Sequence, residues 1–150
     1  MGATATPGTV IVKFQPAAER SVRRTWPRPE DQEALRRHVL KLRHWPARGP
    51  AGKGGKVLDM DWSLIRACAG EKIYELRVAD RIGGQRNVRV IFCVAPDAGS
   101  DATAVHVLTV MVKKRQRFTS HDLDTFRCGR QNVLADYQRA SSTRPRLAVV

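Results

Sequence analysis

The fold is decided by residues 72–123, which read KIYELRVADRIGGQRNVRVIFCVAPDAGSDATAVHVLTVMVKKRQRFTSHDL. Three runs in this stretch are rich in β-branched residues and predict strands: 72–78, 87–94 and 104–112. Gly83, Gly84 and the segment 96–99 supply turn residues between the runs. Because the connections are short, we expect an antiparallel meander, with the third run central or covered on both faces.

Helices are predicted on both sides of this meander along the chain. Thr119 to Asp122 has the form of a capping box, with Asp in place of the usual Glu, so a helix is expected from about residue 120. Upstream, Pro29 suits the first position of a helix that ends before Pro46. Its apolar stripe recurs at helical spacing: Leu35, Val39, Leu42 and Trp45.

A length of 150 residues favours a single domain. Residues 1–28 are expected to be an N-terminal extension with a candidate first strand at 9–14, since 15–28 show no period. Residues 29–139 are expected to form an α+β domain, in which an N-terminal and a C-terminal helix pack on a small antiparallel sheet. Residues 140–150 are interpreted as a tail.

Charge is the strongest indication of function in the composition. The formal net charge is +13, the pI is about 10.8, and 20 of the 27 basic residues are arginine. Guanidinium groups match phosphate groups and stack on bases, so a nucleic-acid partner is expected. A genome that prefers arginine codons is the alternative reason for the ratio of arginine to lysine.

The cysteines and the apolar segments indicate a cytoplasmic location. Cys68, Cys93 and Cys128 are odd in number and lack metal-ligand spacing, and free thiols suit a reducing compartment. The first nine residues lack the regions of a signal peptide, and no apolar run approaches the roughly 18 residues of a membrane span. We therefore expect no membrane partner, metal or cofactor, and the scattered carboxylates argue against a two-metal site.

Two arginines are expected to meet on one face of the meander. Side chains alternate along a strand, so a Gly-Gly hairpin places Arg77 and Arg89 close together, away from the apolar face. Two adjacent guanidinium groups repel each other and favour an anion between them. In the alternative interpretation, Glu75 or another carboxylate neutralises them.

A basic segment follows the third predicted strand. Lys113, Lys114, Arg115 and Arg117 place four charges in five residues and predict a phosphate-binding patch, although such a run is commonly a solvated turn. His121 follows in the first turn of the last helix, where the helix dipole favours the neutral imidazole that a general base needs. A lone exposed histidine more often has no such role.

The loop 47–56, ARGPAGKGGK, is rich in glycine and basic. It lacks the spacing of a phosphate-binding P-loop, so we interpret it as a flexible linker. In the alternative interpretation it is a mobile arm that contacts RNA through Lys53 and Lys56. Arg86, beside the Gly-Gly turn, is a further expected RNA contact.

The order of these motifs resembles the RelE/ParE superfamily of toxins, and within it the HigB-like branch. The motifs are YELR at 74–77, RVIF at 89–92 and VMVKK at 110–114. The resemblance covers about residues 30–138 in architecture and 72–127 in motif. It implies a RelE-like fold and a ribosome-dependent endoribonuclease that cleaves mRNA without a metal. It also implies a cognate antitoxin, expected to be a helix-turn-helix protein, that holds the toxin inactive.

The resemblance also assigns roles to residues of this chain. The family's sheet arginines correspond to Arg77 and Arg89, and its Tyr or His near the start of the last helix falls on or next to His121. Catalytic roles are therefore expected for Arg77, Arg89, Lys114, Arg115 and His121. Contacts to RNA are expected for Lys113, Arg117, Arg86, Lys53 and Lys56.

The chain departs from the family pattern after its Lys-Lys pair. Phe118, Thr119 and Ser120 stand where the family often has Thr-Pro. Relatives in the ParE branch share the fold and act on gyrase. The alternative function is therefore a non-catalytic binder of gyrase or RNA, which needs the arginines but no general base.

Overall fold

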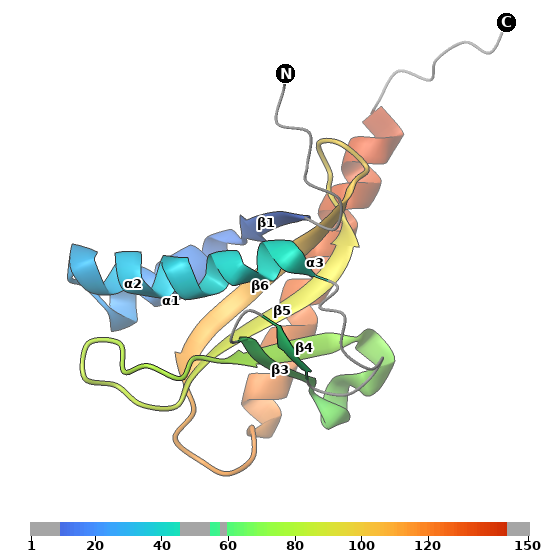
Figure 1. The fold of residues 1–150 in the computed structure, drawn as a ribbon. Helices are drawn as coiled ribbons and strands as arrows, with labels where there is room; N and C mark the ends of the chain where they lie inside the picture. The colour runs from blue at the N-terminus through green and yellow to red at the C-terminus, as the bar shows by residue number, and fades with distance from the viewer. Residues whose placement is uncertain (1–9, 46–54, 58–59, 144–150) are drawn as a thin grey trace, which may run out of the picture.

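The computed structural model describes residues 10–45, 55–57 and 60–143, which form an α+β fold on a mixed six-stranded sheet. The elements follow the chain in the order β1 (Ile11–Phe14), α1 (Pro16–Thr25), α2 (Pro29–Leu40), the 3-10 helix η1 (Lys41–His44), β2 (Gly55–Val57), β3 (Met60–Leu64), the 3-10 helix η2 (Arg66–Glu71), β4 (Ile73–Arg77), β5 (Val88–Pro96), β6 (Thr103–Val112) and α3 (Ser120–Thr143). Helices α1 and α2 cover one face of the sheet and α3 the other (Figure 1). This arrangement is consistent with the predicted RelE-like fold.

The predicted meander is confirmed, and the sheet extends beyond it on both sides. The strand order is β1-β6-β5-β4-β3-β2, and all neighbours from β6 to β2 run antiparallel. β1 differs from the predicted antiparallel sheet, because it pairs parallel to β6 over residues 104–107. It is the first strand and β6 the last, so no short turn constrains their relative direction.

Helix α1 lies in the segment 15–28, whose sequence shows no period. Arg23 and Arg24 lie in its last turn, near the negative end of the helix dipole. Ala18 and Val22 are its buried apolar side chains, which are too few to make a stripe visible in the sequence. Both belong to the same core cluster as residues of β5 and β6, although they fall within the predicted extension.

Alternation of side chains along the strands separates two cores. Leu76 and Phe92 face α1 and α2, where they join a cluster that includes Trp26. Ile91 faces the other way and joins a smaller cluster with Phe126 of α3. The polar side chains of β4 and β5 therefore share a face with α3.

Helix α3 begins at the predicted capping box. The backbone N–H of Asp122 donates to Thr119 Oγ1 at 3.0 Å, and the N–H of Thr119 donates to Asp122 Oδ2 at 2.9 Å. The helix continues to Thr143, into the segment interpreted as a tail. No helix in the described part of the chain is long and apolar enough to cross a membrane.

The connection between β4 and β5 is anchored to the helical layer by Trp26. The indole Nε1 of this buried side chain donates to the Ile82 carbonyl at 2.9 Å. The next residue, Gly83, has φ +56°, and a Cβ there would lie 2.9 Å from Asp31 Oδ2 and 3.0 Å from Trp26 Cδ1. Glycine is required here because of the positive φ and because a Cβ would collide with these two side chains. The backbone of Gly83 therefore lies close to Asp31 of α2.

Candidate nucleic-acid interface

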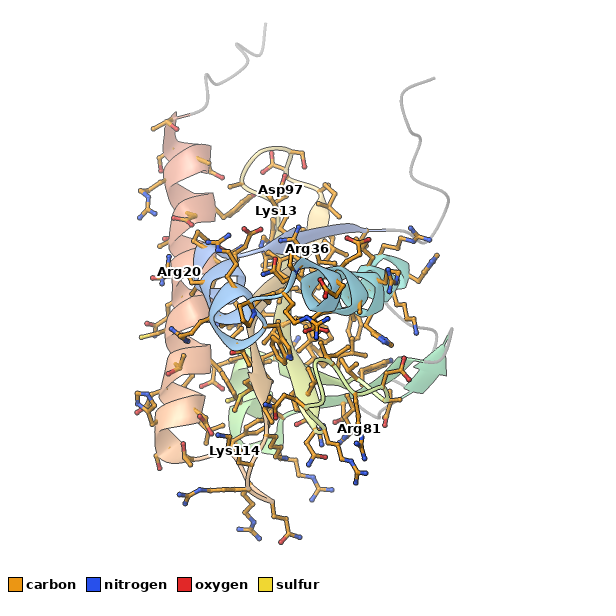
Figure 2. The ribbon with its side chains drawn as sticks, turned by 90° about the vertical axis from the view of Figure 1, so that its left-hand side faces the viewer. Lys13, Arg20, Arg36, Arg81, Asp97 and Lys114 are labelled. Atoms are coloured by element: carbon orange, nitrogen blue, oxygen red, sulfur yellow. The ribbon has the colours of Figure 1, made fainter. Side chains whose placement is uncertain are left out.

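Two connections form a basic end of the molecule. The backbone N–H of Lys113 donates to the Asn87 carbonyl at 2.8 Å, so the β4–β5 connection lies beside the β6–α3 connection. Figure 2 shows Arg81 of the first and Lys114 of the second at this end, away from the ion pair of Lys13 and Asp97. We define the basic end by six residues: Arg81, Arg86, Lys113, Lys114, Arg115 and Arg117.

The charges of the basic end are not neutralised within the described chain. None of the six residues makes an ion pair with a carboxylate of the described residues. All are exposed except Lys113, which is half-buried. Its ammonium group lies 4.4 Å from the centre of the Phe118 ring, a cation–π contact that leaves the charge in place. This surface is therefore strongly positive and open to an anionic partner.

A groove of about 760 Å³ opens beside the basic end, on the face of the sheet that α3 partly covers. Its walls come from β3, η2, β4, the β6–α3 connection and the start of α3. Arg77, Lys113 and Arg117 line it, as do Glu75 and Phe118. The structure thus brings together three of the basic residues that the sequence predicts for the site, although Arg77 and Lys113 are 36 positions apart in the sequence.

Arg77 and Arg89 lie opposite each other in the β4–β5 register, as the hairpin predicts. Between them is Glu75, whose Oε1 lies 3.2 Å from Arg89 Nε and 3.6 Å from Arg77 Nε. The Glu75 side chain is 7% exposed. Of the two interpretations of the arginine pair, the structure therefore has the one in which a carboxylate neutralises them.

The two arginines differ in how far they remain accessible. Arg77 is 39% exposed, lines the groove, and donates to Asp61 Oδ1 at 3.1 Å and to Ser63 Oγ at 3.0 Å. Arg89 is 14% exposed and is not among the residues that line the groove. Arg77 is thus the arginine of the pair that a ligand in the groove could contact, whereas Arg89 donates a hydrogen bond to Glu75 and is largely buried.

Other predicted site residues lie outside the groove. His121 is the second residue of α3 and is exposed. Phe118, which lines the groove, lies in the connection that precedes α3. Lys114 lines a different hollow. Arg115 is exposed on the connection between β6 and α3. Lys53 lies outside the described residues.

Lys56 belongs to β2, where its backbone pairs with Asp61 of β3. The same Asp61 carboxylate accepts the hydrogen bond from Arg77. The predicted contact residue Lys56 therefore belongs to a strand two positions from β4 in the sheet.

Sequence reasoning treated Glu75 as a neutralising partner and did not include it among the site residues. The signal was available, because alternation along β4 puts Glu75 on the same face as Arg77. Ser63 was missed because residues 57–70 show no clear strand pattern. It lines the groove from β3.

Thiols add no nucleophile to this site. Burial raises the pKa of the Cys93 thiol to about 12 and also raises the pKa of the Cys68 thiol, so neither is a thiolate near neutral pH. The exposed Cys128 lies on α3 and does not line the groove. Within the described ranges, no group of three or more His, Cys, Asp or Glu side chains is arranged to hold a metal ion.

The fold and the site together define an α+β protein with a polar groove at a basic end. Comparison with protein-family models, curated proteins and solved structures finds no match. The chemistry of the groove is therefore the basis for proposing a function.

Proposed function

We propose that this protein is the toxin of a type II toxin–antitoxin system, an endoribonuclease that cleaves mRNA on the ribosome in the cytoplasm. The observation that carries the proposal is the groove of about 760 Å³ that Arg77, Lys113 and Arg117 line at the basic end. Such a volume accommodates a nucleotide-sized ligand. The unneutralised charges around it supply the phosphate contacts that dominate affinity for nucleic acid.

Single-stranded RNA is the form of nucleic acid that suits the groove. Phe118 lines it and packs edge-on against Phe126, with ring centroids 5.1 Å apart. Because the Lys113 ammonium lies over one face of the Phe118 ring, an unpaired base stacks on the opposite face. Lys113 and Arg117 lie in the same wall and can bind the flanking phosphates.

The proposed reaction needs no metal. The 2′-hydroxyl of the bound RNA attacks the adjacent phosphorus, and the bond from phosphorus to the 5′-oxygen breaks, leaving a cyclic phosphate and a 5′-hydroxyl end. Among the described residues that line the groove, Glu75 is the one with a carboxylate side chain. We propose that this carboxylate accepts the proton of the 2′-hydroxyl. Arg77 and Lys113 stabilise the charge that grows on the phosphate oxygens.

His121, to which the family resemblance assigns proton transfer, is exposed and does not line the groove. The departing 5′-oxygen is bonded to the phosphorus that is attacked in the groove, so in the proposed reaction water supplies the proton that this oxygen needs. Low activity away from the ribosome is expected, since the ribosome would hold the RNA in the reactive geometry.

The partner that restrains the toxin is expected to be an acidic segment of an antitoxin, with a helix-turn-helix domain that binds DNA. A chain of net charge +13 attracts an acidic partner strongly and rapidly. The basic end offers six unneutralised cations for that contact. Occupying them would block the groove at the same time.

A non-catalytic binder is the second candidate function, and one observation favours it. Glu75 is already engaged by Arg89 at 3.2 Å, so a role in binding alone, with the carboxylate ordering the arginines, needs no further chemistry. The target of such a binder would be gyrase, as in ParE-type toxins, or RNA itself. Cleavage products distinguish the two functions.

Induced expression in a bacterial host tests the proposed function. We expect growth arrest and the appearance of mRNA 5′ ends at defined sites within coding regions, measured by primer extension. Co-expression of the neighbouring gene should restore growth. Free expression at high level, with unchanged translation, would refute the toxin assignment, and arrest with intact mRNA and inhibited gyrase would favour the second candidate.

Binding of RNA should weaken steeply as salt rises. Each phosphate contact in a single strand contributes about 0.7 to the slope of log K against log salt. The double variant Lys113→Gln/Arg117→Gln should therefore have a slope shallower by about 1.4, measured by fluorescence anisotropy on a 2′-O-methyl oligonucleotide that cannot be cleaved. Arg37→Gln is the matched control, because Arg37 is exposed on α2 and paired with Glu33. An unchanged slope in the double variant would remove this wall of the groove from the interface.

A further inference from the structure

A second basic hollow lies on the opposite side of the β6–α3 connection from the groove. It measures about 240 Å³ and is enclosed by the end of α1, the β4–β5 connection and the end of β6. Among the described residues, its charged side chains are Arg24 and Lys114, and neither aspartate nor glutamate lines it. Uncharged hydrogen-bonding side chains complete the polar part of the lining: Ser21, Thr25, Gln85 and Thr109.

The edge of β6 contributes backbone groups to this hollow. β1 pairs with β6 only over residues 104–107, and beyond it the N–H of Val110 donates to Ser21 Oγ at 3.3 Å. Val88, the β5 partner of Val112, accepts from the N–H of Val78, the residue that follows β4. The N–H and C=O of a strand residue point to the same side, so both backbone groups of Val88 point toward β4 and away from β6. Val88 and Val112 therefore do not hydrogen-bond to each other, and the backbone groups of Val112 point away from β5. The N–H of Val112 therefore points toward the hollow.

The cations of the hollow lack the neutralisation found in the groove. Arg77 and Arg89 share Glu75, whereas no ion pair to a described carboxylate involves Arg24 or Lys114. Ser21 Oγ already donates to the Ala18 carbonyl and Thr109 Oγ1 to Ser21 Oγ, so the neutral side-chain donors of the hollow are the Thr25 hydroxyl and the Gln85 amide. Together with the two cations, they match the oxygens of a phosphate group. The described residues that line the hollow include no aromatic side chain and offer no platform for a base.

We propose that the hollow binds a backbone phosphate of the same RNA strand that occupies the groove. Lys113 lines the groove and the adjacent Lys114 lines the hollow, so a strand that crosses the β6–α3 connection passes from one to the other. This inference rests on the proposed function and extends its footprint to α1. The contact is to the phosphate alone and is therefore independent of base sequence.

The test compares oligonucleotides that reach the hollow with ones that do not. We expect Arg24→Gln to weaken binding of a 2′-O-methyl decanucleotide about tenfold, the loss of one charge-assisted hydrogen bond, with a salt slope shallower by about 0.7. Binding of a trinucleotide, which fills only the groove, should not change. Arg23→Gln is the matched control, because Arg23 is the preceding residue of the same helix turn and pairs with Glu19 at 3.3 Å. It should bind both oligonucleotides as the wild type does.

Each outcome separates this inference from the proposed function. Equal loss in Arg23→Gln and Arg24→Gln would mean that only the general charge of α1 matters, and would overturn the hollow as a site. An unchanged affinity of Arg24→Gln for the decanucleotide, with Lys113→Gln/Arg117→Gln still impaired, would overturn the hollow and leave the groove intact. A wild type that binds neither oligonucleotide would refute the RNA-binding function itself.

Discussion

Glu75→Gln should lower the rate of mRNA cleavage by roughly 10²–10⁴-fold, the contribution of a positioned proton acceptor. The amide keeps the size of the carboxylate and an oxygen that can still accept from Arg89, whose Nε lies 3.2 Å away. It cannot accept the proton of the 2′-hydroxyl. The rate should be measured by primer extension in cells and on ribosomes programmed with a defined mRNA.

The same substitution should have the opposite effect on binding. Removing a negative charge from a groove that Arg77, Lys113 and Arg117 line strengthens attraction for phosphate, so affinity for uncleavable RNA should rise. Opposite changes in cleavage and binding cannot come from a general loss of structure. Thermal unfolding followed by circular dichroism is the control for folding.

His121→Ala is the companion variant for the assignment of the proton acceptor. Its side chain is exposed and outside the groove lining, so folding and RNA binding should stay unchanged. A full 10²–10⁴-fold loss in this variant, combined with near-normal cleavage by Glu75→Gln, would give the role of base to His121 and overturn the assignment to Glu75.

Trp26→Ala should lower the free energy of unfolding by about 3–5 kcal/mol, the usual cost of truncating a large buried aromatic side chain. Trp26 is 1% exposed in the larger core. Its indole also donates to the Ile82 carbonyl and holds the connection that carries Arg81 and Arg86. Urea denaturation measures the change, and a loss below about 1 kcal/mol would contradict the packing described for this residue.

Trp26→Phe separates the hydrogen bond from the packing. A phenyl ring remains, but the Ile82 carbonyl keeps only the donor from Gln85, so the lost hydrogen bond should cost about 0.5–1.5 kcal/mol. Amide hydrogen exchange should then accelerate at Gln85, whose N–H donates to the Ile82 carbonyl at 2.9 Å. Unchanged exchange there would show that Trp26 does not anchor the β4–β5 connection.

Local pattern was enough to predict the elements that carry the motifs. The meander of β4, β5 and β6 follows from β-branched runs and turn residues, and the start of α3 follows from Thr119 and Asp122. The opposition of Arg77 and Arg89 follows from alternation across a short hairpin. Each of these features depends on contacts between residues that are near in sequence or joined by a tight turn.

Helix α1 and the partner of β1 could not be predicted in this way. Ala18 and Val22 give a stripe of two residues, so the burial of α1 becomes visible only when β6 is beside it. The parallel pairing joins the first strand along the chain, β1, to the last, β6. A run of four residues contains no signal for a partner about 90 residues away in the sequence.

The sequence by itself determined the α+β class, the strong positive charge and the two arginines on one face of a hairpin, because composition, period and turn chemistry are local properties. Tertiary structure alone decided which charged side chains line the groove. It buried Glu75 between Arg77 and Arg89, placed Lys113 and Arg117 in the lining of one groove, and placed Lys114 and Arg24 in the lining of the hollow. The physical reason is that neutralisation and concavity depend on distances across the sheet and between loops, which packing sets and which no spacing along the chain encodes.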